Sequence, residues 1–185
     1  MPSSPSEPSV TNSGSPLPPA LPPLWKPELD AIVGARLGGA AAVLLPRLRD
    51  LDSRHPNTPE ILAQIAWTCE TLGRYREAAG FYERAVALGL PPNELSAAML
   101  GLGSALRCLG DYARAEAVLR QGRLQFPNQR EFDVFLAIAL HNLGRHAEVL
   151  QLLLGTLIET ADDVGITSQG RTIRFLAAQL DRKWE

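Results

Sequence analysis

Leu72-Gly73-Arg74-Tyr75 decides how this chain folds, because the same pattern occurs twice more along the sequence. It returns as Leu109-Gly110-Asp111-Tyr112 and, with histidine in place of tyrosine, as Leu143-Gly144-Arg145-His146. Together with Gly39, these glycines form a series with spacings of 34, 37 and 34 residues. A recurring period of this length is typical of a protein built from stacked structural repeats.

Apolar residues on both sides of each glycine follow helical spacing. Around Gly73 they are Ile61, Ile65, Cys69 and Leu72 before the glycine, and Ala78, Phe81, Tyr82, Ala85 and Leu88 after it. A glycine can adopt the left-handed conformation that ends one helix and turns the chain back. Each period is therefore predicted to be two helices. Because a single pair cannot bury both apolar faces, the pairs are predicted to stack.

The pattern resembles the tetratricopeptide repeat. The resemblance rests on Leu-Gly-x-Tyr between two helices, and on Ala78, Tyr82, Ala85 and the repeat-ending Pro127. Residues 59–184 as a whole are also similar to small bacterial tetratricopeptide proteins of one domain. The resemblance implies an all-α fold, a right-handed superhelical solenoid of helix-turn-helix repeats.

The predicted organisation has four parts. Residues 1–24 are rich in proline and serine and lack the features of a signal peptide, so we expect a disordered tail on a cytoplasmic protein. Residues 25–57 are expected to form a degenerate N-terminal helical pair, with Pro46 distorting its second helix. Three clear repeats are predicted at 58–92, 93–127 and 128–161. Residues 162–185 should form one capping helix whose apolar stripe covers the third repeat, made of Ile166, Ile173, Leu176, Leu180 and Trp184.

Capping residues predict where several helices begin. Thr58 precedes Pro59, which favours a helix that starts there and runs near Glu60 to Leu72. Asn128 and Glu131 have the spacing of a capping box. The helices of the third repeat are expected at about 129–143 and 146–159. Asp162 and Asp163 can cap the closing helix.

Composition argues against nucleic-acid and membrane binding. The 185 residues carry a formal net charge of -2, and lysine and arginine are scattered among acidic residues, so no basic face is predicted. No apolar run approaches the 18 residues or so of a membrane span.

The sequence also offers no catalytic, metal or cofactor site. Cys69 and Cys108 are two places out of phase on neighbouring helices, and are expected to be reduced packing residues on different faces. His55, His141 and His146 lack metal-ligand spacing. Gly101-Leu102-Gly103 follows no strand and lacks a third glycine, so a dinucleotide site is not predicted. With no pair of nucleophile and base visible, we do not expect an enzyme.

The resemblance implies a concave groove along the first helices of the repeats, which binds a protein or peptide partner. The residues carried onto this surface are Gln64, Trp67, Glu70, Thr71, Leu100, Ser104, Arg107, Val134, Ile138 and His141. Trp67 is the expected anchor, because large aromatic side chains commonly dominate such contacts. Some members of the family clamp a peptide's terminal carboxylate with Lys, Asn and Arg. The corresponding places here hold Ala63, Trp67, Gly101, Glu131 and Phe135, so this clamp is absent.

These observations predict a non-catalytic protein-binding module, acting as an adaptor or a chaperone-like holder. The alternative is a self-assembling homo-oligomer in which a second copy, or the chain's own tail, fills the groove.

Overall fold

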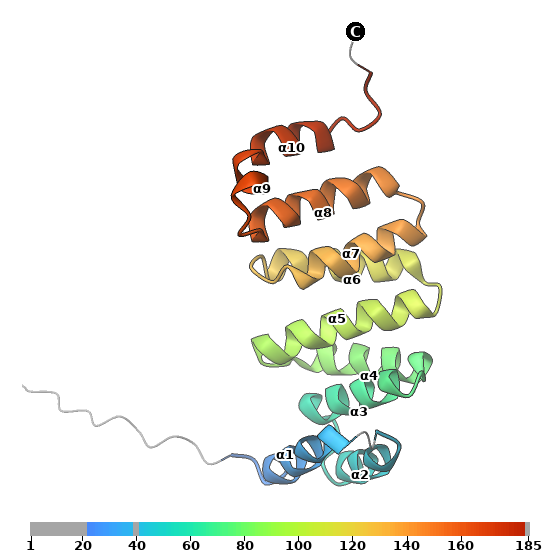
Figure 1. The fold of residues 1–185 in the computed structure, drawn as a ribbon. Helices are drawn as coiled ribbons and strands as arrows, with labels where there is room; N and C mark the ends of the chain where they lie inside the picture. Colours follow the sequence, from blue (N-terminus) through green and yellow to red (C-terminus); the bar gives the residue numbers. More distant parts are fainter. Residues whose placement is uncertain (1–21, 39–40, 184–185) are drawn as a thin grey trace, which may run out of the picture.

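The computed structural model describes residues 22–38 and 41–183, which form a stack of helices (Figure 1). The first unit contains α1 (Lys26–Gly34), the 3-10 helix η1 (Ala35–Gly38) and α2 (Ala41–Arg54). Three pairs follow: α3 (Pro59–Thr71) with α4 (Tyr75–Leu88), α5 (Pro92–Cys108) with α6 (Tyr112–Gln125), and α7 (Glu131–Asn142) with α8 (His146–Thr160). The chain continues in α9 (Val164–Ser168) and α10 (Gly170–Ala177). The described ranges contain no strand, which confirms the all-α prediction.

Each helix from α2 to α8 packs against the next one along the chain, and the first helices of the repeats also touch. Thus α3 contacts α5, and α5 contacts α7. The helices follow one another from bottom to top in Figure 1, in the order of the sequence. This sequential packing is how stacked repeats bury a continuous core.

The repeated glycines make the turns that the sequence predicts. Gly73, Gly110 and Gly144 have φ of 72°, 80° and 74°, in the left-handed region where a side chain would be strained. After Gly73, the amide of Arg74 donates to the carbonyl of Cys69 at 2.8 Å, which satisfies one of the last carbonyls of α3. The predicted helix ends around Gly73 agree with the observed ones to within one residue.

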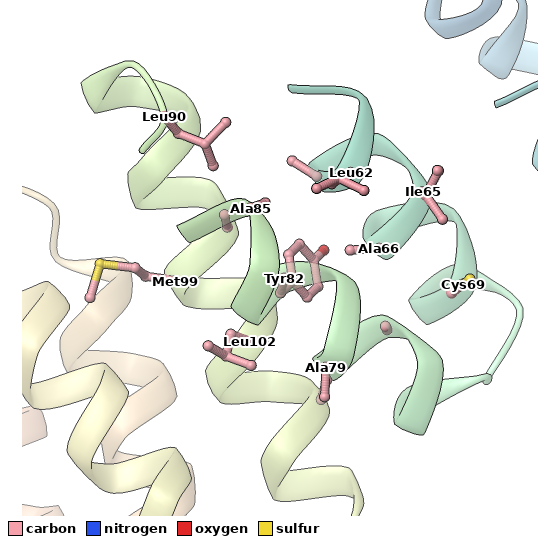
Figure 2. Close-up of a cluster of buried hydrophobic side chains, with 14 of the residues drawn as sticks. Leu62, Ile65, Ala66, Cys69, Ala79, Tyr82, Ala85, Leu90, Met99 and Leu102 are labelled. Atoms are coloured by element: carbon pink, nitrogen blue, oxygen red, sulfur yellow. The ribbon is translucent and has the colours of Figure 1, made fainter. Parts of the chain in front are cut away.

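Small residues let the helices approach closely. Ala66 on α3 is fully buried and lies beside Tyr82 of α4 (Figure 2), and Ala78 on α4 is fully buried too. Gly103 on α5 shows the same need, because a Cβ there would lie 2.6 Å from Cγ of Leu119. Gly101 and Gly122 lie in the same way beneath the rings of Tyr82 and Phe132.

Ala78→Leu should lower the free energy of unfolding by about 1–3 kcal/mol, because extra methylene groups would overpack a fully buried position. Chemical denaturation of this variant and of Arg76→Leu would check it. Arg76 is exposed two residues earlier on α4, so its replacement should be nearly silent. Equal losses at both sites would contradict the packing described here.

The N-terminal unit keeps its apolar faces, and Pro46 does not end its second helix. Leu29 and Ile32 of α1 are buried, as are Leu44, Leu45, Leu48 and Leu51 of α2. Pro46 is exposed, so the hydrogen bond that it cannot make is lost on the side of the helix that faces water. The predicted turn residue Gly39, most of the predicted tail and Trp184 lie outside the described residues.

The predicted start of α3 is confirmed, with Thr58 at the N-cap and Pro59 at the first helical position, but two predicted side-chain caps do not form. Thr58 stands at the N-cap of α3, but its hydroxyl donates to the carbonyl of His55 at 2.9 Å instead of capping the helix. The capping box at Asn128 does not form, because α7 begins at Glu131. The chain first makes a turn in which the amide of Gln129 donates to the carbonyl of Phe126 at 3.0 Å, and this turn keeps Asn128 outside the helix.

The C-terminal segment forms two short helices where one was predicted. Asp163 caps α9, accepting a hydrogen bond from the amide of Ile166 at 2.9 Å. The contact of α10 with α8 uses small residues, since Gly170 and Ala177 are buried and a Cβ on Gly170 would lie 2.8 Å from Cγ2 of Ile158. Leu176 and Leu180, which the predicted stripe would have buried, are 49% and 40% exposed. That part of the prediction is wrong, because close approach favours the small residues of α10 over its leucines.

Candidate functional site

The candidate site lies along α3, α5 and α7, the three helices that carry the predicted groove residues. Because α3 touches α5 and α5 touches α7, residues at the same place in successive repeats form columns across the three helices. One column holds Trp67, Ser104 and Ile138. We call the surface formed by the ten predicted residues the groove face: Gln64, Trp67, Glu70, Thr71, Leu100, Ser104, Arg107, Val134, Ile138 and His141.

Trp67 is 40% exposed, and one face of its ring is covered by the protein's own N-terminal unit. The guanidinium carbon of Arg36 lies 3.7 Å from the centre of the ring, a cation-π contact. The Nη2 of Arg36 also donates to Oε1 of Gln64 at 2.7 Å. Sequence reasoning missed Arg36, because it stands 31 residues before Trp67 in the irregular first unit and belongs to no repeat column.

A cavity of about 120 Å³ opens beside Trp67, between α3 and α5. Its lining residues are Arg36, Ala63, Gln64, Trp67, Tyr82, Glu94, Ala97 and Ala98. The Nε of Arg36 is buried here without a hydrogen-bond partner among the described residues, and desolvation lowers the pKa of its guanidinium. Burial raises the pKa of Glu94 at the same cavity. The cavity therefore combines an aromatic wall with a cation whose hydrogen-bonding capacity is only partly used.

Tyr82, one of the residues that line the cavity, connects α4 to the groove face by a hydrogen bond. Its hydroxyl donates to Oε2 of Glu70 at 3.0 Å. Burial raises the pKa of Tyr82, and the neighbouring carboxylate of Glu70 raises it further. The hydroxyl of Thr71 donates to the carbonyl of Trp67 at 2.9 Å, so Thr71 is engaged by its own helix.

The groove-face residues of α5 are half-buried, whereas those of α7 include exposed apolar side chains. On α5, Leu100 and Ser104 are half-buried, and Leu100 packs against the core. Arg107 is half-buried, with Nη2 3.3 Å from Sγ of Cys108. On α7, Val134 and Ile138 are 43% and 44% exposed. The apolar side chains of the groove face are thus most accessible at its two ends, on α3 and α7.

The two cysteines lie apart in the structure, whereas two of the three histidines lie close together. Cys69 is buried and Cys108 is exposed, which confirms that they lie on different faces, but the prediction that both are packing residues is wrong for Cys108. The turn at Gly144 brings the rings of His141 and His146 within 4.9 Å of each other, a proximity that their positions on two separate helices did not indicate. Within the described ranges, no group of three or more metal-ligating side chains comes together.

A larger cavity of about 380 Å³ lies away from the groove face, among α6, α7, α8 and α10. Its charged lining residues are Arg120, Arg123, Asp133, Glu148, Glu159 and Arg174. All of them take part in ion pairs, such as Arg120 with Glu148 at 3.4 Å and Arg174 with Glu159 at 3.8 Å. Since the charges are already matched within the chain, we do not assign a ligand to this cavity. No described helix has the length and apolar character needed to cross a membrane.

Residues 59–166 match the family model described as tetratrico peptide repeat. A search of curated proteins finds no match. Among solved structures, the chain is similar to a MamA RS-1 ArsTM double mutant, with a TM-score of 0.60 at 20% identity over 84% of this chain and 95% of that one. It is also similar to MamA 41-end from Desulfovibrio magneticus RS-1, with a TM-score of 0.60 at 19% identity over 86% and 97% of the two chains. At such identities the similarity shows a shared fold.

Proposed function

Because the chain belongs to the tetratricopeptide repeat family, we propose that it is a non-catalytic module that binds a partner polypeptide on its groove face. The supporting observation is the exposure of large apolar side chains there: Trp67, Val134 and Ile138 are 40%, 43% and 44% exposed. Exposed apolar patches of this kind tend to mark contacts with other proteins. An adaptor or a chaperone-like holder in the cytoplasm fits this activity.

The residues around Trp67 suggest which chemical groups of the partner would contact this part of the groove face. Stacking on the indole covers one face of the Arg36 guanidinium, whose Nε is buried and whose Nη2 donates to Gln64, so a partner would meet the guanidinium at its Nη atoms. A planar guanidinium edge is well matched to a carboxylate. We therefore expect the partner to place an apolar side chain beside Trp67 and an acidic group near Arg36.

Trp67→Ala should weaken partner binding about thirtyfold or more, corresponding to roughly 2 kcal/mol, because aromatic anchors dominate the affinity of such surfaces. The fold should survive, since Trp67 is 40% exposed, whereas the core residue Tyr82 is 2% exposed. A partner captured with the wild-type protein would be purified and its affinity measured for wild type and variant.

The matched control is Arg84→Ala, an exposed position on α4 that does not belong to the groove face. If this control loses as much binding as Trp67→Ala, or if neither loses any, the groove proposal fails. Sedimentation of the purified protein over a range of concentrations tests the alternative. Self-association that Trp67→Ala abolishes would mean that a second copy occupies the groove face.

A further inference from the structure

The C-terminal end of the stack leaves uncovered a surface that is covered in the preceding repeats. On α4, Ala79 and Tyr82 are 6% and 2% exposed, and Val86 packs against the core. Tyr82 lies at the contact between α4 and α5, where its ring rests over Gly101, and Ala79 lines a cavity together with Leu106 of α5. Val86 follows Tyr82 by four residues, so helical spacing puts it on the same side of α4. The first helix of the next repeat therefore covers this side of α4.

On α8, the positions that correspond to these three residues of α4 hold leucines, and the leucine side chains are exposed to solvent. Leu150, Leu153 and Leu157 each stand 71 residues after Ala79, Tyr82 and Val86, and they are 49%, 37% and 44% exposed.

Helix α10 does not cover them, because it packs on another side of α8. Its Gly170 meets Ile158, and its Ala177 lines a cavity together with Gln151. With 3.6 residues per turn, Ile158 and Gln151 point about 80–160° away from the three leucines.

The exposed apolar residues of α7 extend this surface. Val134 and Ile138 stand 71 residues after Ala63 and Trp67, which line a cavity facing α5 in the first clear repeat. Ile138 and Leu150 are each six residues from Gly144, so the helical hairpin brings them to the same level. We call the five residues Val134, Ile138, Leu150, Leu153 and Leu157 the open seat, because a following repeat would stack there.

The residue types of the open seat suit a contact better than exposure to water. On α6, the places of Leu150 and Leu157 are held by Glu116 and Arg123, and both form ion pairs with the following unit. A terminal repeat that faces only solvent usually has a polar outer side. The N-terminal unit is more charged, since α2 exposes Arg47 and Asp50, while its Arg49 and Arg54 pair with Glu77 of α4 and Glu28 of α1.

We propose that the open seat pairs with the open seat of a second copy of this chain, giving a two-fold symmetric dimer joined end to end. A seat lined by five aliphatic side chains can meet a copy of itself without like-charge repulsion. The charged N-terminal end does not match it, so head-to-tail stacking into filaments is disfavoured. A contact between identical surfaces closes after two copies. Because Val134 and Ile138 belong to both surfaces, the dimer would cover these two residues of the groove face and leave Trp67, on α3, for a partner.

The test therefore uses residues of α8, which lie outside the groove face. Sedimentation velocity of the full chain over a range of concentrations should show a monomer becoming a dimer. Leu153→Glu and Leu157→Glu should each raise the dissociation constant about tenfold or more, because each would bury a charge in an apolar contact. Circular dichroism would verify that both variants fold.

Leu124→Glu is the matched control, since Leu124 is a leucine on α6 that is 82% exposed and lies outside the open seat. It should dimerise like wild type. A wild-type protein that stays monomeric at every concentration would overturn the proposal, as would equal weakening by Leu124→Glu. Self-association that Trp67→Ala abolishes and Leu153→Glu leaves intact would overturn it too, and would place the contact on the groove face. The first two outcomes leave binding of a different polypeptide at Trp67 untouched, whereas the third would favour a second copy as the occupant of the groove face.

Discussion

Phe132→Ala should lower the free energy of unfolding by about 3–5 kcal/mol, the range expected when a fully buried aromatic ring is removed from a core. Phe132 is fully buried in the first turn of α7. Its ring stacks on Phe126, with centroids 6.0 Å apart, and it occupies the space over Gly122 that a side chain would fill. The loss should be large because two helices and the turn between them meet at this ring, so the cavity cannot collapse easily.

Chemical denaturation monitored by circular dichroism would measure this loss. Leu124→Ala provides the control, because Leu124 lies on the neighbouring helix and is 82% exposed. Its replacement should change the unfolding free energy by about 0.5 kcal/mol or less. A loss at Leu124 comparable to that at Phe132 would contradict the packing of α6 against α7.

Tyr82→Ala should also cost about 3–5 kcal/mol, because the ring lies against Gly101 on α5 and in the buried cluster around Ala66 (Figure 2). Tyr82→Phe keeps the ring and removes the hydroxyl, so it measures the contribution of the hydroxyl alone. It removes only the hydrogen bond to the half-buried Glu70, which should cost on the order of 1 kcal/mol.

Thermal and urea unfolding of both Tyr82 variants would distinguish the two contributions. If Tyr82→Phe were as damaging as Tyr82→Ala, the hydrogen bond to Glu70 would be the main contribution and the packing argument would be wrong. A nearly silent Tyr82→Ala would mean that α4 and α5 do not meet through this ring.

Partner binding at Trp67 and dimerisation through the open seat depend on different parts of the helical stack. Binding at Trp67 depends on the N-terminal unit, because Arg36 covers one face of the indole. Dimerisation through the open seat depends on α8, at the opposite end of the stack. Since the surfaces share only Val134 and Ile138, single substitutions at Trp67 and Leu153 should separate them.

Local features of the fold could be predicted from the sequence because local interactions produce them. The glycines after Leu72, Leu109 and Leu143 terminate helices through their own backbone freedom. The apolar periodicity around them correctly predicts buried positions, as Ala78 and Ala85 illustrate. The resemblance to a repeat family also predicts which residues form the groove face, and this stays a prediction.

Tertiary structure alone decided the features that depend on which surfaces meet. Arg36 stacks on Trp67 only because the irregular first unit folds back over α3, and residues before Gly39 follow no repeat column. The capping signal at Asn128 is overridden by the turn that begins at Phe126, whose ring stacks on Phe132.

The C-terminal end illustrates the same division. Periodicity predicts one helix after Asp163, where the structure forms two, and it does not determine where α10 docks, because the small residues Gly170 and Ala177 make the contact in place of Leu176. The close approach of Gly170 to Ile158 places α10 to one side of α8, and this leaves Leu150, Leu153 and Leu157 exposed. A sequence pattern records which side chains are apolar, whereas the fit of one helix on another determines which of them remain exposed to solvent.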